Sequence, residues 1–286
     1  MSQLVHAPHA GRRVRPMGLV LTYVVAIALG LIILLPVIYG VLGGFKDTGQ
    51  LGTNGLGLPH PWRFSNYSGI IKSGTFWRQA GNSALIGLAT VLIVVSVSAC
   101  AAFVFARFAF RGREFLAMLF AIGLMFPFQA AILPIFVLLR TFDLLDNPLG
   151  VILPQAGFGL PVTIIILRAF FRAIPREVEE AATMDGCSTF RFFWSILLPM
   201  ARPALATVSV LALVMSWNNF LLPLVVFNNP DWWTLPVGVQ QFKTEYSTDY
   251  ARVLAYTVMA MVPALAFYAV AERHLIGGLT SGATKG

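Results

Sequence analysis

The sequence predicts an all-α, polytopic membrane protein with six transmembrane helices and a cytoplasmic helix–turn–helix. Of its 286 residues, 57% are hydrophobic and only 11% are charged, whereas about 25% are charged in a soluble protein. A helix of about 20 apolar residues spans the hydrocarbon core, and the strands of a membrane barrel are only about 10 residues long. Six runs of 19 residues or more contain no Asp, Glu, Lys, Arg or His: 16–45, 79–106, 115–139, 147–167, 203–230 and 253–271.

Six spans place both termini on one side of the membrane. That side carries 13 of the 20 Lys and Arg residues, and the side richer in basic residues is cytoplasmic. We therefore expect a multi-pass protein of the cell membrane with cytoplasmic termini. Its expected parts are a tail over 1–15, a transmembrane domain over 16–272 and a second tail over 273–286. The net charge of +8 is then explained by basic residues in the cytoplasmic segments, and we expect no nucleic-acid partner.

Glycines and prolines mark special positions within the spans. Gly40 and Gly44 in the first span have the spacing that lets two helices approach closely, although composition alone can also produce it. Pro127 and Pro134 interrupt the backbone hydrogen bonds of the third span, and the freed groups must face protein or a water-filled cavity. Gln129 lies between them, so we expect it near a central pathway. The expected helices are 17–43, 81–106, 115–139, 149–167, 203–226 and 253–271.

The most polar stretch, 168–202, carries five Arg, three Glu and one Asp. Because each charge at the bilayer centre costs about 2.5–3.5 kcal/mol, this stretch is expected in the cytoplasm. A first helix can begin at Pro175 and end at Gly186, where a positive φ is tolerated. Ser188 can cap a second helix, which Pro199 ends or bends.

This stretch resembles the "EAA" loop of the permease subunits of binding-protein-dependent ABC importers. The matching residues are Glu180-Ala181-Ala182, Gly186 and Ile196-x-Leu198-Pro199. The resemblance implies a coupling helix that docks into a groove on an ATP-binding subunit, with the small alanines allowing close approach. A surface helix without a partner is the alternative. The residues implied in coupling are Glu180, Ala181, Ala182, Asp185, Gly186, Ile196, Leu198 and Pro199.

The C-terminal residues 277–286 resemble the "GGLT…KG" ending of maltose-type permeases, and Phe64, Asn66 and Tyr67 match a run in the first outer loop of sugar permeases. These matches narrow the expectation to the second permease of a carbohydrate importer. In that family the ending approaches the ATPase dimer. The residues implied in this contact are Gly278, Leu279, Thr280, Lys285 and Gly286.

Polar residues in the fifth span suggest a route for substrate. Adjacent amides in mid-span are costly unless they face partners or a polar cavity, so an interhelical hydrogen bond is the equal alternative. Related sugar permeases often carry an acidic residue where this chain has Asn219, so the resemblance does not imply a charge-based role here. The candidate pathway residues are Gln129, Trp217, Asn218 and Asn219.

The outer loop 228–250 holds a second candidate contact. The matching loop of maltose-type permeases probes the binding protein, and here Asp231, Trp232 and Trp233 are the candidates for that contact. Tryptophans in such a loop also suit an aromatic belt at the membrane surface.

The chain contains no G-x-x-x-x-G-K-[ST] motif, so we expect a transport subunit that is not itself an enzyme. It should work with a second permease, two copies of an ATP-binding subunit that bind ATP and Mg, and an extracytoplasmic sugar-binding protein. The chain is expected to bind no cofactor or metal of its own. The alternative is a stand-alone facilitator or secondary transporter, although ion coupling usually needs ionisable groups in the spans, and the six runs contain none.

Overall fold

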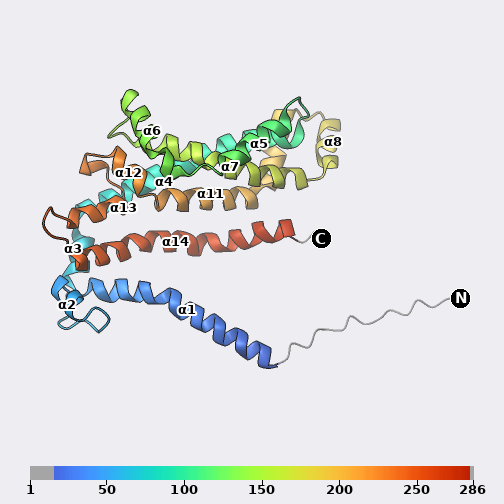
Figure 1. Ribbon diagram of the computed structural model, residues 1–286. Helices are drawn as coiled ribbons and strands as arrows, with labels where there is room; N and C mark the ends of the chain where they lie inside the picture. The colour runs from blue at the N-terminus through green and yellow to red at the C-terminus, as the bar shows by residue number, and fades with distance from the viewer. Residues whose placement is uncertain (1–15, 284–286) are drawn as a thin grey trace.

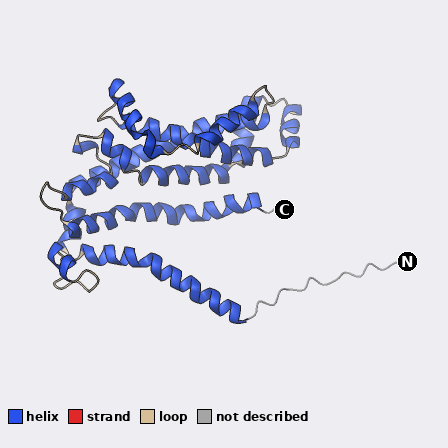
Figure 2. Ribbon diagram, in the orientation of Figure 1, coloured by secondary structure: helices blue, strands red, loops and turns tan. Residues whose placement is uncertain are grey.

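The computed structural model describes residues 16–283, and this part of the chain is a bundle of helices without a named strand (Figure 2). Within residues 16–283, four helices are long and apolar enough to cross a membrane. They are α1 (Pro16–Gly44), α4 (Gly74–Arg107), α7 (Pro148–Ala173) and α14 (Tyr250–Ala283). The predicted tail 1–15 and the residues Lys285 and Gly286 lie outside the described residues.

Two further candidate spans are bent. The helices α5 (Arg113–Gly123) and α6 (Phe128–Thr141) meet at 96°, and the segment 189–200 meets α11 (Arg202–Trp217) at 76°. With each bent pair counted as one span, the described residues hold up to six, which agrees with the predicted number.

The third and fifth spans were each predicted as one helix, and both predictions are wrong. Pro127 has no N–H to continue α5 and is the N-cap of α6. After α11 the helix stops, and α12 (Leu221–Val226) begins anew. There the side chain of Asn219 accepts a hydrogen bond from the backbone N of Leu222, at 3.2 Å. Both breaks therefore follow from local backbone chemistry.

The first outer loop is tied to the end of α1. It contains α2 (Thr48–Thr53) and α3 (Ser65–Lys72), and α4 then begins seven residues before the predicted start at Gly81. Buried Lys46 donates from Nζ to the carbonyl oxygens of Asn54 and Gly55, at 2.7 and 2.8 Å. Asn66 Nδ2 donates to the carbonyl oxygens of Gly44 and Lys46, which gives this residue of the predicted sugar-permease match a structural role.

The C-terminal end of α1 packs against the N-terminal half of α14, and the two helices diverge from there (Figure 1). Glycines allow the contact. A Cβ on Gly44 would lie 2.9 Å from the Cα of Ala255, and a Cβ on Gly40 would lie 3.4 Å from Val258 Cγ2. The predicted close approach at this glycine pair is confirmed. The predicted end of the last helix near 271 is wrong, because α14 continues to Ala283 and includes Gly278, Leu279 and Thr280.

The centre of the bundle is formed by α4, α7 and α11, which make extensive contacts with one another. Val94, Val151 and Leu167 on these helices are completely buried. The small outer elements are η2 (Pro230–Trp232), α13 (Leu235–Gly238) and η3 (Val239–Phe242). Figure 1 shows α2, α3 and α13 at one end of the bundle and α8 (Arg176–Met184) at the opposite end, where α14 also finishes.

The α1–α14 contact can be tested with Gly44→Val. The added side chain would meet the backbone of Ala255 and also the ring of Tyr67 on α3, so we expect a loss of about 1–3 kcal/mol of stability and a lower midpoint of thermal unfolding in detergent. Gly30→Val is the matched control, because a Cβ there meets nothing within 4 Å. Equal midpoints for the two variants would show that the contact does not support the fold.

Candidate functional site

The polar segment forms the predicted helix–turn–helix. Helix α8 ends at a turn in which Gly186 has a φ of +75°. The backbone N of Cys187 there donates to the carbonyl oxygen of Ala182, at 2.9 Å. Ser188 Oγ then accepts from the backbone N of Arg191 at 3.3 Å and caps α9 (Thr189–Phe192). The second helix continues through a π-helical turn over Phe193–Leu197 and through α10 (Leu198–Met200).

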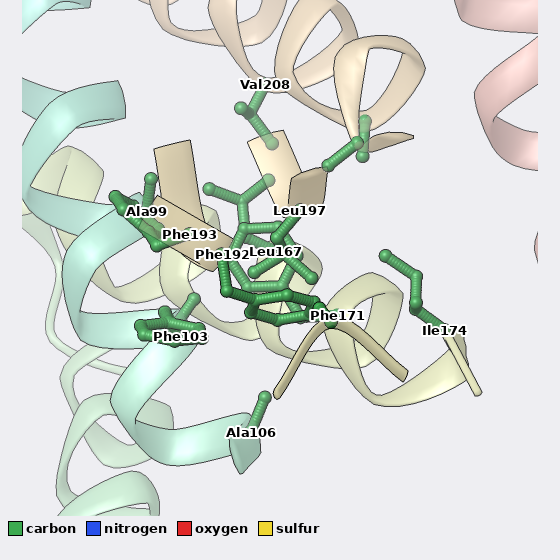
Figure 3. Packing of buried hydrophobic residues seen from close by; sticks show 14 residues of the cluster. Ala99, Phe103, Ala106, Leu167, Phe171, Ile174, Phe192, Phe193, Leu197 and Val208 are labelled. Atoms are coloured by element: carbon green, nitrogen blue, oxygen red, sulfur yellow. The ribbon is translucent and has the colours of Figure 1, made fainter. Parts of the chain in front are cut away.

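Aromatic side chains anchor this segment in the membrane bundle. Phe192, Phe193 and Leu197 are at most 5% exposed and belong to one cluster with Phe103 of α4 and Phe171 of α7 (Figure 3). The rings of Phe103 and Phe193 have centroids 4.9 Å apart. Because the interior is close-packed, a displacement of the segment must be passed on to α4 and α7.

The two alanines of the motif have different environments. Ala181 is exposed, as are Glu180, Asp185 and Gly186. Ala182 is only 8% exposed and packs into the aromatic cluster. The expectation that both alanines offer a small surface to a partner is therefore wrong for Ala182, because successive helical residues point about 100° apart.

The residues in the second half of the motif also differ in their exposure. Ile196 and Leu198 are half-buried and pack against the same cluster, while Pro199 is exposed. Large apolar side chains nevertheless face outward beside the glycine turn. Met184 is 88% exposed and Phe190 is 74% exposed, and such apolar exposure is typical of a protein-binding surface.

A buried arginine joins α8 to the end of α4, and sequence reasoning treated it only as a topology charge. The side chain of Arg107 is 3% exposed, and its Nη1 lies 3.6 Å from Glu179 Oε2. Its Nη2 donates to the carbonyl oxygen of Ile174, at 3.0 Å. In the sequence, only the position of Arg107 at the end of a predicted helix could have pointed to such a role. Its pairing with Glu179, 72 residues further along the chain, depends on the tertiary structure.

A second ion cluster joins α5 to α7. Glu114 on the first turn of α5 accepts from Arg168 Nη2 at 2.7 Å and from Arg172 Nη2 at 2.9 Å. Both arginines lie near the end of α7, one helical turn apart. The cluster links this end of the bent third span to the helix that leads into α8.

A half-open cavity of about 440 Å³ lies between α4, α6, α7 and α11, and residues of the break between α5 and α6 also line it. Two of the four predicted pathway residues, Gln129 and Asn219, line it. The other two, Trp217 and Asn218, line a separate pocket of about 280 Å³ beside α13 and α14. Sequence reasoning missed three polar residues of the larger cavity, namely Thr90, Gln155 and Ser216.

The outer loop is held more tightly than the sequence suggested. Asp231 forms an ion pair with Arg78 at 2.9 Å, and Asn82 Nδ2 donates to the carbonyl oxygens of Asp231 and Trp233. Trp233 Nε1 in turn donates to a backbone carbonyl at 3.2 Å. Trp232 and Trp233 are half-buried against an apolar cluster.

The most exposed aromatic residue of this loop is instead Tyr246, at 90%. It lies in a tight turn in which Lys243 pairs with Thr248 and the backbone N of Thr244 donates to the carbonyl oxygen of Ser247. Residues 243–248 therefore form the projecting tip of the outer loop.

Comparison with known proteins agrees with this architecture. Residues 98–274 match the family model "Binding-protein-dependent transport system inner membrane component". The chain is 34% identical to the diacetylchitobiose uptake system permease protein NgcG of Streptomyces coelicolor, over 92% of this chain and 87% of that protein. It is also 34% identical to the trehalose transport system permease protein SugB of Mycobacterium tuberculosis, over 88% of this chain and 93% of that protein.

Solved structures share the fold. A chain of a bacterial ABC transporter involved in the import of the acidic polysaccharide alginate aligns with a TM-score of 0.77 and 26% identity. The alignment covers 93% of this chain and 99% of that one. A chain of the MetNI methionine ABC transporter aligns with a TM-score of 0.55 at 13% identity, over 71% of this chain and 93% of that one.

The Arg107–Glu179 pair can be tested with Arg107→Met. This change removes a buried charge partner and leaves the Ile174 carbonyl without its donor, so α8 should open locally more often. We expect amide hydrogen exchange in Arg176–Met184 to accelerate on the order of tenfold. Arg111→Met, on the exposed turn that follows, is the control. Unchanged exchange in α8 would exclude a positioning role for Arg107.

Proposed function

The chain belongs to the family of binding-protein-dependent transport system inner membrane components, and on this premise we propose that it is one of two permease subunits of an ATP-driven carbohydrate importer. The sugar assignment is supported by relatives whose names specify diacetylchitobiose, arabinooligosaccharides and trehalose as transported compounds. The observation that carries the proposal is the 175–199 segment. It is anchored in the bundle by aromatic side chains and exposes Glu180, Ala181 and Phe190.

The proposed assembly contains this chain, a second permease, two ATP-binding subunits and an extracytoplasmic sugar-binding protein. ATP and Mg are bound by the ATP-binding subunits, since this chain has no phosphate-binding loop motif. The residues proposed to meet an ATP-binding subunit are those exposed around the glycine turn. Residues 278–286 are proposed to approach the same subunits.

We assign the end of the bundle that carries α8 to the cytoplasm. Basic side chains concentrate there, at the ends of α4 and α7 and along 168–202, and cytoplasmic loops are enriched in Lys and Arg. The end of α14 lies at the same end of the bundle (Figure 1). The opposite end, with the tip 243–248, is then proposed to meet the sugar-binding protein, in place of the half-buried Trp232 and Trp233.

The proposed mechanism is a rigid-body coupling between two distant sites. Closure of the ATP-binding subunits would move the 175–199 segment as a unit. The Phe103–Phe193 contact and the Arg107–Glu179 pair would carry that movement into α4. The helices around the membrane cavity would then exchange inward-open and outward-open arrangements.

The proposal predicts that uptake requires ATP. Proteoliposomes containing the two permeases and the ATP-binding subunits should accumulate sugar only with internal ATP and external binding protein. Equal uptake by the permeases alone would favour the stand-alone facilitator instead. A complex reconstituted without ATP serves as the control for leakage.

The glycine turn gives a sharper prediction. A Cβ at Gly186 meets nothing within 4 Å, so Gly186→Val acts only through its strained positive φ, at about 1–2 kcal/mol. We expect ATP hydrolysis and uptake to lose their coupling in this variant, whereas Gly186→Asn, which tolerates this conformation, should retain most uptake.

Gly112→Val is the matched control for this test. Gly112 has a φ of +86° and equal space around it but lies outside the coupling segment. Equal loss of uptake in Gly186→Val and Gly186→Asn, or full uptake in both, would contradict a requirement for positive φ at this turn.

A further inference from the structure

We propose that the cavity between α4, α6, α7 and α11 is a subsite for an uncharged sugar, built around the amide of Gln155. This inference rests on the proposed function as a carbohydrate importer. The volume of about 440 Å³ falls in the range of roughly 300–1,000 Å³ that is usual for small-molecule sites. One or two sugar rings are therefore the appropriate scale of ligand.

The amide of Gln155 is incompletely satisfied. Its side chain lines the cavity although the residue is only 8% exposed. Oε1 accepts a hydrogen bond from Ser216 Oγ at 2.6 Å and from Thr90 Oγ1 at 3.4 Å. Nε2 is buried and has no hydrogen-bond partner among the described residues. A buried donor needs an acceptor, and a sugar hydroxyl or ring oxygen would supply it when the amide turns toward the cavity.

Two further amides belong to the same cavity and come from other parts of the bundle. Gln129 is exposed on the first turn of α6, and Asn219 is half-buried in the break between α11 and α12. Because Asn219 Oδ1 caps α12, its amide nitrogen remains available as a donor. Neutral amides that offer both donors and acceptors match the hydroxyl groups of a carbohydrate.

Aromatic rings supply the apolar part of the site. Phe126, Phe128 and Phe158 all line the cavity. Phe158 lies edge-on to Phe128, with ring centroids 4.8 Å apart, and 6.4 Å from Phe126. A few polar groups among aromatic and aliphatic walls are the usual composition of a small-molecule pocket, and the C–H face of a sugar ring can pack on such rings.

The uncharged lining of the cavity selects the class of sugar. No Lys, Arg, His, Asp or Glu is among the described residues that line the cavity. A carboxylate moved there from water would have no cation to compensate its lost hydration, so an acidic sugar is disfavoured. The alginate transporter, which is involved in the import of an acidic polysaccharide, shares the fold. The shared fold therefore does not determine whether a neutral or an acidic sugar is bound; the side chains that line the cavity do.

The test measures sugar binding to the purified complex of both permeases and the ATP-binding subunits, without binding protein, by saturation-transfer NMR. The neutral probes are trehalose, diacetylchitobiose and an arabinooligosaccharide, and the acidic probe is digalacturonate. We expect at least one neutral probe to bind clearly more strongly than digalacturonate. In Gln155→Leu its signal should fall about three- to tenfold, as expected for the loss of one or two hydrogen bonds. Gln241→Leu, an exposed change outside the cavity, should leave the signal intact.

Gln129→Lys keeps the inference testable if Gln155→Leu does not fold. Gln129 is exposed, and a cation there should raise digalacturonate binding several-fold. Equal binding of neutral and acidic probes by the unmodified complex, or no response to Gln155→Leu and Gln129→Lys, would overturn the subsite. ATP-dependent sugar uptake by the same complex, reconstituted in proteoliposomes with external binding protein, would leave the proposed function standing. Absence of that uptake would reject the function itself.

Discussion

The packing of Phe192, Phe193 and Leu197 against α4 and α7 is the contact on which the rest of this structure depends. It turns a polar loop into a rigid extension of the membrane bundle. The side of the segment that is not used in this packing, around Glu180 and Ala181, is left free for another protein. A coupling element needs both properties, because force from outside can reach the spans only through a surface that is itself firmly attached.

The interior of the bundle departs from regular helices where polar chemistry is concentrated. The break before Pro127 and the break after Trp217 both border the cavity that holds Gln129 and Asn219. Irregular backbone at membrane depth is tolerated where it is buried in protein or lines a cavity. The broken spans, the amide side chains and the uncharged lining are thus parts of one arrangement around this cavity.

Several features of the fold were predictable because they depend on a short piece of sequence. The turn at Gly186, the cap at Ser188 and the close approach at Gly40 and Gly44 each follow from local residue chemistry. Uncharged runs likewise predicted the spans, but the continuity of two spans and the bounds of α4 and α14 were wrong. An apolar run shows that a segment suits lipid, but it does not show whether the helix within it is straight.

Composition and local motifs by themselves determined the membrane class, the number of spans and the helix–glycine–helix segment, because burial in lipid and backbone conformation are selected residue by residue. Only the tertiary structure decided that Ala182 faces inward and that Arg107 pairs with Glu179. It also brought Thr90, Gln155 and Ser216 together across three helices. Such pairings join residues more than 60 positions apart, and their partners are selected by how helices pack, which no single stretch of the chain encodes.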